Sequence, residues 1–141
     1  MKHALRSLLG TTLRTVDLGL LLLRVWVGAV LALEHGWGKV SDLGTFTSNI
    51  AARVPFAGVL APAAALSEFA GGLLLVVGLA TRPAAAFILA TMSVAVFRFH
   101  AADPFGKKEL ALAYGVAALA LLVAGPGRLS ADARLFGSKP D

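Results

Sequence analysis

Charged and aromatic residues interrupt or border the apolar runs of this sequence. Side chains of these types can bind polar head groups or exchange protons. These residues are Arg24, His35, Trp37, Glu68, Arg98, His100 and Glu109. Ionisable side chains within a membrane are costly, and they usually face the bundle interior or water and pair with one another. One interpretation is therefore structural, with ion pairs that lock helices together among Arg24, Glu68, Arg98 and Glu109. The other interpretation is a polar pocket for a ligand.

A quinone is the ligand that best fits these side chains. Its head group needs a hydrogen-bond donor such as His or Arg for each carbonyl oxygen, and its tail needs an apolar slot. For such a quinone or polar pocket we predict the ligand-binding residues His35, Trp37, Glu68, Arg98 and His100. Two of the basic and aromatic residues have competing roles, since Trp37 could anchor the chain at the membrane interface and Lys39 could extend to the lipid surface.

Haem and metal sites have weaker support. Di-iron sites in helix bundles favour Glu-x-x-His on facing helices, whereas Glu34 and His35 are adjacent and point to different faces. His35 and His100 could ligate haem axially, but two histidines are a thin basis. The sequence contains no cysteine, so thiolate metal sites, iron–sulfur clusters and thiol relays within the chain are excluded. We therefore expect neither haem nor a metal, and no catalytic residue can be named.

Four apolar runs must position these side chains. They extend over about residues 18–36, 56–80, 83–102 and 109–124, and a membrane span needs roughly 20 mostly apolar residues. Of the 141 residues, 57% are hydrophobic and 15% are charged, whereas soluble domains average about 45–50% and about 25%. Between the first two runs, Leu43, Phe46, Ile50 and Val54 recur at near-helical spacing. The sequence predicts an all-α fold, a membrane four-helix transmembrane bundle with a short amphipathic outer helix.

The chain divides into three parts on this basis. Residues 1–17 form an N-terminal interfacial segment, residues 18–126 the four-helix transmembrane domain, and residues 127–141 a cytoplasmic C-terminal tail. Four spans place both termini on one side, which carries Lys2, Arg6, Arg14, Arg82, Arg128, Arg134 and Lys139. The other side carries fewer basic residues, namely Lys39, Arg53, Lys107 and Lys108. Cytoplasmic loops are enriched in Lys and Arg, so both termini are predicted in the cytoplasm, and the net charge of +5 reflects orientation rather than nucleic-acid binding.

Glu68 is predicted to lie near the middle of its helix, deeper than the charged residues of the outer end. At about 100° per residue it is centred on a face of small residues, formed by Ala61, Ala64, Ala65, Gly71 and Gly72. Such a face packs against neighbouring helices. A buried carboxylate without a cation would take up a proton, so we predict that Glu68 pairs with Arg24 or Arg98.

Several segments of the chain together resemble the DoxX family. They are Arg24…Gly28…His35-Gly36-Trp37-Gly38-Lys39, Glu68-Phe69-Ala70-Gly71-Gly72, Gly78-Leu79-Ala80-Thr81-Arg82, then His100, Glu109 and Gly125-Pro126-Gly127-Arg128-Leu129-Ser130. They cover about residues 20–132, nearly the whole chain. The resemblance implies a multi-pass, four-helix protein of the bacterial inner (cell) membrane. It also implies a membrane-redox setting, since the family includes a subunit type of thiosulfate:quinone oxidoreductase and members linked to redox-stress complexes.

Three functional hypotheses follow. A quinone-associated oxidoreductase subunit, or membrane component of a redox complex, predicts a pocket open to lipid between helices. A non-catalytic membrane scaffold or assembly factor predicts tight charge pairing and no pocket. A small proton- or cation-coupled transporter predicts water access from both sides. The expected partners are membrane lipid, a redox-complex protein and a second copy of the chain in a homo-oligomer, and no nucleic acid is expected.

Overall fold

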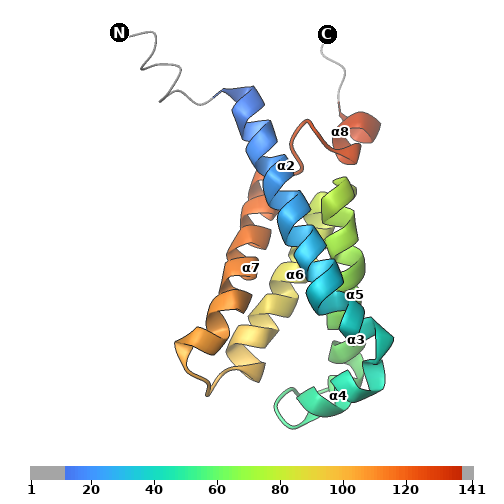
Figure 1. Ribbon diagram of the computed structural model, residues 1–141, viewed down its shortest axis with the longest axis vertical. Coiled ribbons are helices and arrows are strands. Elements are labelled where there is room, and N and C mark those ends of the chain that lie inside the picture. Colours follow the sequence, from blue (N-terminus) through green and yellow to red (C-terminus); the bar gives the residue numbers. More distant parts are fainter. Residues whose placement is uncertain (1–11, 138–141) are drawn as a thin grey trace.

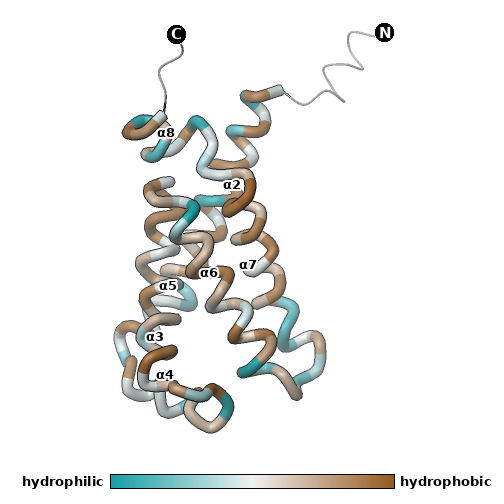
Figure 2. The backbone as a smooth tube through the Cα atoms, turned by 180° about the vertical axis from the view of Figure 1, so that it is seen from behind, coloured by the Kyte–Doolittle hydropathy of each residue, from teal (hydrophilic) through white to brown (hydrophobic). Residues whose placement is uncertain are grey.

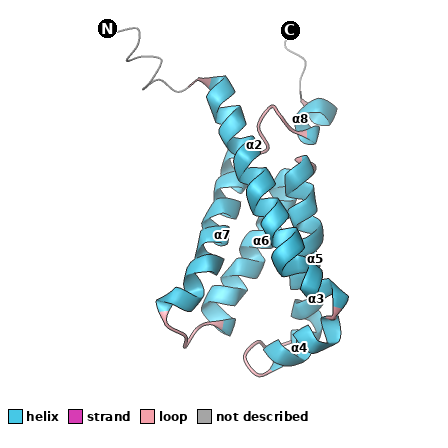
Figure 3. Cartoon of the chain, in the orientation of Figure 1, coloured by secondary structure: helices cyan, strands magenta, loops and turns pink. Residues whose placement is uncertain are grey.

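The computed structural model describes residues 12–137, and every regular element in that range is a helix (Figure 1). The first helix is continuous but contains a π-helical turn, so it is divided into α2 (Leu13–Val30), η1 (Leu31–Gly36) and α3 (Trp37–Ser41). The following elements are α4 (Leu43–Ala51), α5 (Ala57–Val77), α6 (Thr81–Val94) with its π-helical end η2 (Ala95–Phe99), α7 (Phe105–Ala124) and α8 (Ala131–Phe136). Short loops join them (Figure 3).

The four long helices form an up-and-down bundle, in which successive helices run in opposite directions (Figure 1). Three of them are long and apolar enough to cross a membrane, over Leu13–Ser41, Ala57–Val77 and Thr81–Phe99. The fourth, α7, has 20 residues and packs along α6, but Lys107, Lys108 and Glu109 lie near its start. Many of the hydrophilic positions lie toward the two ends of the bundle (Figure 2). The predicted all-α membrane bundle is confirmed.

The bundle has two distinct ends. The described chain begins and ends at one of them, which we call the terminal end, whereas α4 lies at the opposite end, which we call the α4 end (Figure 1). The predicted outer helix is α4. Ile50 on its apolar face is buried in a small cluster with Val54, Ala57 and Ala61, and Val94 and Phe99 pack against this cluster.

Glycines allow the first helix to lie directly against α5. A Cβ atom on Gly72 would lie 2.6 Å from the carbonyl oxygen of Gly28, and a Cβ atom on Gly36 would lie 2.5 Å from the main-chain nitrogen of Phe69. No side chain fits between backbones that approach so closely. Because Phe69 follows Glu68, the contact at Gly36 brings α3 beside the carboxylate that the sequence singles out.

The predicted terminal segments are placed only in part. Residues 1–11 of the expected interfacial segment lie outside the described residues, and residues 13–17 belong to α2. The C-terminal tail contains α8, which lies beyond the end of α5 at the terminal end (Figure 1). Residues 138–141 also lie outside the described residues.

A pocket between three helices

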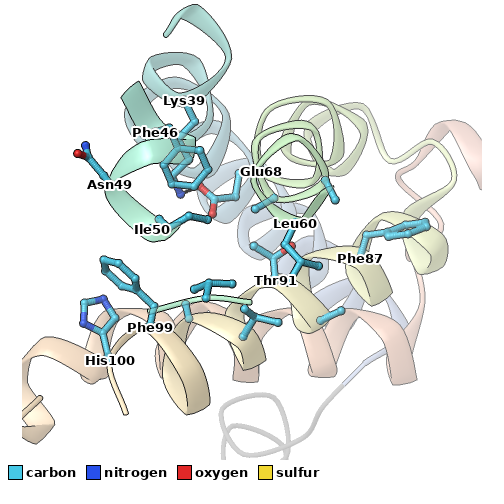
Figure 4. Close-up of a pocket in the computed structure, with 16 residues that line it drawn as sticks. Lys39, Phe46, Asn49, Ile50, Leu60, Glu68, Phe87, Thr91, Phe99 and His100 are labelled. Atoms are coloured by element: carbon cyan, nitrogen blue, oxygen red, sulfur yellow. Dashed lines mark hydrogen bonds and ion pairs between the residues drawn. The ribbon is translucent and has the colours of Figure 1, made fainter. Parts of the chain in front are cut away.

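A cavity of about 440 Å³ lies between α4, α5 and α6 toward the α4 end (Figure 4). Its wall is mostly apolar, and it is formed by Phe46, Ile50, Val54, Leu60, Ala63, Ala64, Phe87, Ala90, Val94, Ala95 and Phe99. The polar side chains that reach it are few, namely Lys39, Asn49, Glu68, Thr91 and His100. An apolar cavity with a few placed polar groups is the usual form of a small-molecule site.

Lys39 and Glu68 form an ion pair in the wall of this cavity. The Glu68 side chain is 4% exposed and that of Lys39 is 26% exposed. The Lys39 ammonium also lies 5.1 Å from the centre of the Phe46 ring, within the range of a cation–π contact. The carboxylate is therefore buried beside a cation, and this cation also contacts an aromatic residue of α4.

The predicted arginine partners of Glu68 were wrong. Arg24 precedes Lys39 by 15 residues, which is roughly 20 Å along a helix, and it lies toward the terminal end. Its guanidinium is fully buried and donates hydrogen bonds to the carbonyl oxygens of Leu75, at 3.1 Å, and Leu129, at 2.6 Å. Arg98 is exposed. The close contact at Gly36 instead turns Lys39 inward, so it pairs with Glu68 rather than extending to lipid.

A second set of polar side chains, His100, Asp103 and Arg53, lies near the α4 end of the cavity. His100 Nδ1 lies 2.7 Å from Asp103 Oδ2, and Arg53 Nη1 lies 3.3 Å from the same oxygen. The hydrogen bond from His100, aided by the charge of Arg53, holds the pKa of the Asp103 carboxyl below its ordinary value. An ionised carboxylate only accepts hydrogen bonds. His100 must therefore donate through Nδ1, which leaves Nε2 for another partner.

The structure brings only two of the five predicted ligand-binding residues to the cavity, Glu68 and His100. His35 instead packs edge-on against Tyr114 of α7, with ring centres 5.5 Å apart. Trp37 is 58% exposed and lies beside Phe69. Neither these two residues nor Arg98 line the cavity.

Glu109, expected in an ion pair, is also exposed, and within residues 12–137 it forms none.

The π-helical turns explain most of these differences. His35 lies in η1 and Arg98 in η2. A π-turn pairs each residue with the fifth one before it and so shifts the helical phase, whereas the prediction assumed about 100° per residue throughout. Sequence reasoning also missed the pocket residues Lys39, Asn49 and Thr91. For Lys39 a signal existed, because it lies three residues after Gly36, at the contact with α5.

Comparison with known proteins agrees with this architecture. The family model described as DoxX matches residues 19–101. The chain is also similar to the inner membrane protein YqjF of Escherichia coli (strain K12), with 34% identity over 130 residues, which cover 87% of this chain and 95% of that protein. No solved structure gives a significant match.

Proposed function

The chain belongs to the DoxX family of membrane proteins, and from this premise we propose that it binds a quinone in the pocket as the membrane component of a redox complex. The observation that carries the proposal is an apolar cavity of about 440 Å³ whose wall contains the paired Lys39 and Glu68. Pockets for small molecules commonly measure about 300–1,000 Å³. The cavity is thus large enough for a ring and the first part of an apolar tail.

The charges of the pocket favour a neutral head group. Glu68 offsets the charge of Lys39, so an added carboxylate or ammonium would lack a counter-ion in an apolar site, which is costly. The ammonium of Lys39 carries three donors and gives one to Glu68. A donor therefore remains for a carbonyl oxygen of the ligand.

His100 supplies a second polar contact at the other side of the cavity (Figure 4). Its Nδ1 is held by Asp103, so Nε2 can accept a hydrogen bond from a quinol hydroxyl or, when the ring is protonated, donate one to a quinone oxygen. Since the chain has no cysteine, no thiol of its own can supply electrons to a bound quinone, and the proposal assigns that role to a partner protein.

The cavity supports this proposal over the two alternatives. A scaffold predicts tight pairing and no pocket, which a cavity of about 440 Å³ does not favour. A transporter predicts water access from both sides, whereas Arg24 is fully buried beneath the C-terminal segment and occupies the bundle at the terminal end. The relative in Escherichia coli is named an inner membrane protein. We propose that this chain also lies in the bacterial inner membrane, and that its terminal end faces the cytoplasm because more basic residues flank the spans there.

Analysis of the molecules that co-purify with the full chain tests the proposal. The chain is purified from native membranes in mild detergent, and bound lipophilic molecules are extracted and identified by mass spectrometry. Quinone is expected at a near-stoichiometric level with the native chain and at a much lower level with Ala64→Phe, which fills the cavity beside Glu68. Ala70→Phe is the matched control, because Ala70 is exposed on α5 and does not line the cavity. Equal quinone in all three preparations would contradict the proposal.

A further inference from the structure

The C-terminal segment, residues 127–136, is fixed against the terminal end of the bundle. The carboxylate of Asp132 accepts hydrogen bonds from the main-chain N–H groups of Ala80, at 2.7 Å, and Thr81, at 2.9 Å, where α6 begins. The N–H of Asp132 donates to the carbonyl oxygen of Gly78 at 2.9 Å. These bonds tie α8 to the turn between α5 and α6.

The first helix holds the same segment from a second direction. Buried Arg24 donates a hydrogen bond to the carbonyl oxygen of Leu129. Close by, the main-chain N–H of Arg128 donates to the Asp17 carboxylate at 2.8 Å. The segment is thus anchored to α2 as well as to α5 and α6, and the surface that it presents is a fixed one.

These contacts occupy both carboxylates of this surface with main-chain N–H groups. Asp17 binds the N–H of Arg128, and Asp132 binds those of Ala80 and Thr81. Four exposed arginines at the terminal end, which we call the arginine rim, form no ion pair within the described range: Arg14, Arg82, Arg128 and Arg134. The rim therefore carries a net positive charge that no carboxylate in residues 12–137 offsets by pairing.

Exposed apolar side chains lie on the same segment as two of these arginines. Leu129, Leu135 and Phe136 are 49%, 65% and 78% exposed. Guanidinium groups beside apolar side chains are typical of surfaces that lie in the headgroup layer of a membrane. The planar guanidinium also binds phosphate oxygens with two hydrogen bonds.

We propose that the arginine rim and α8 form a binding surface for anionic phospholipid head groups. The phosphates pair with the rim, while Leu135 and Phe136 enter the boundary between head groups and acyl chains. This surface is separate from the pocket, which lies toward the α4 end of the bundle.

Lipid binding by the purified full chain tests this inference. Adducts with phosphatidylglycerol and with phosphatidylcholine are counted by native mass spectrometry over a range of lipid concentrations. The native chain is expected to prefer phosphatidylglycerol. The variant Arg82→Gln/Arg128→Gln/Arg134→Gln is expected to lose about fivefold in affinity for each arginine removed, with little change for phosphatidylcholine.

Matched variants separate the rim from general charge effects. Arg53→Gln/Lys107→Gln/Lys108→Gln removes three cations at the α4 end, and it is expected to keep the preference of the native chain. Arg134→Gln alone serves if the triple variant melts at a lower temperature than the native chain, because this exposed side chain forms no hydrogen bond or ion pair with residues 12–137. An unchanged preference in the rim variants, or an equal loss in the control, would overturn the proposal. Full competition by inorganic phosphate would also overturn it, since the surface would then bind the ion and not the lipid.

Discussion

The Lys39 ammonium pairs with the Glu68 carboxylate in the wall of the pocket, across the contact between α3 and α5. The two partners differ in exposure, because the Glu68 side chain is almost fully buried whereas about a quarter of the Lys39 side chain is exposed. The pair therefore joins a buried acid to a base that is partly exposed at the surface of the bundle.

This asymmetry predicts unequal effects of removing either partner. Lys39→Met leaves a buried, unpaired carboxylate and is expected to destabilise the bundle by about 2–4 kcal/mol, toward the cost of breaking a buried pair. Glu68→Gln leaves Lys39 free to turn toward water and is expected to cost less. Melting temperatures in nanodiscs measure both effects, and the double variant should recover part of the loss. Arg98→Gln is the control, because Arg98 is exposed and its effect on stability should add to that of Glu68→Gln. If the effects of the Lys39 and Glu68 variants were also additive, the pair would contribute nothing.

Two glycines that are two residues apart test the contact that brings α3 to α5. A Cβ atom on Gly36 would lie 2.5 Å from the Phe69 nitrogen, whereas one on Gly38 would meet nothing within 4 Å. Gly36→Ala is expected to destabilise by about 1–3 kcal/mol through overpacking. Gly38→Ala is expected to be neutral or to stabilise by up to about 1 kcal/mol, because alanine favours helix. Gly36→Ala should thus melt at a lower temperature than the native chain and Gly38→Ala should not, and equal losses would contradict the close contact.

The docking of the C-terminal segment should depend on pH through Asp132. Burial tends to raise the pKa of Asp132, but the hydrogen bonds from Thr81 and Ala80 and the nearby Arg24 charge outweigh it, so the pKa lies below its ordinary value of 3.8. Because the pKa is lowered in the folded state, ionised Asp132 stabilises the fold fully above pH 3.8. This stabilisation is lost as the pH falls through the lower pKa of the folded state. The melting temperature of the native chain should exceed that of Asp132→Asn at neutral pH. This difference should shrink below pH 3.8, and a difference that stays constant into that acid range would refute the assignment.

The orientation of the chain can be measured with reporters. Seven basic residues flank the spans at the end that carries the termini and four at the other, so the termini are expected in the cytoplasm. A C-terminal fluorescent protein that folds only in the cytoplasm should be bright, and a C-terminal alkaline phosphatase, active only outside, should be inactive. The reverse pattern would invert the topology.

The four long helices were predictable from the sequence because each contains an apolar run bounded by charge, glycine or proline, whereas α8 lies in the predicted tail, where no helix was expected. The outer helix α4 was predictable for a related reason, since Phe46 and Ile50 repeat at helical spacing. The membrane imposes this regularity, because a backbone in lipid must satisfy its own hydrogen bonds.

The pocket was predictable only in part. Glu68 lies in a regular helix, and its burial followed from the small residues around it. His35 and Arg98 lie in π-turns, which no local pattern in the sequence marks and which shift the helical phase. Lys39 was not among the predicted pocket residues, because its inward path depends on how closely Gly36 approaches α5, and that is a property of packing rather than of spacing.

Binding of a short-tailed quinone to the pocket tests the central claim most directly. The purified full chain is titrated in nanodiscs with decylubiquinone, and binding is followed by calorimetry for the native chain, Ala64→Phe, Ala70→Phe and His100→Ala. Saturable binding is expected for the native chain and Ala70→Phe, with at least tenfold weaker binding for Ala64→Phe and a smaller loss for His100→Ala, all at unchanged melting temperature. Equal binding by the native chain and Ala64→Phe, or no saturable binding to the native chain, would contradict the claim that this pocket holds a quinone.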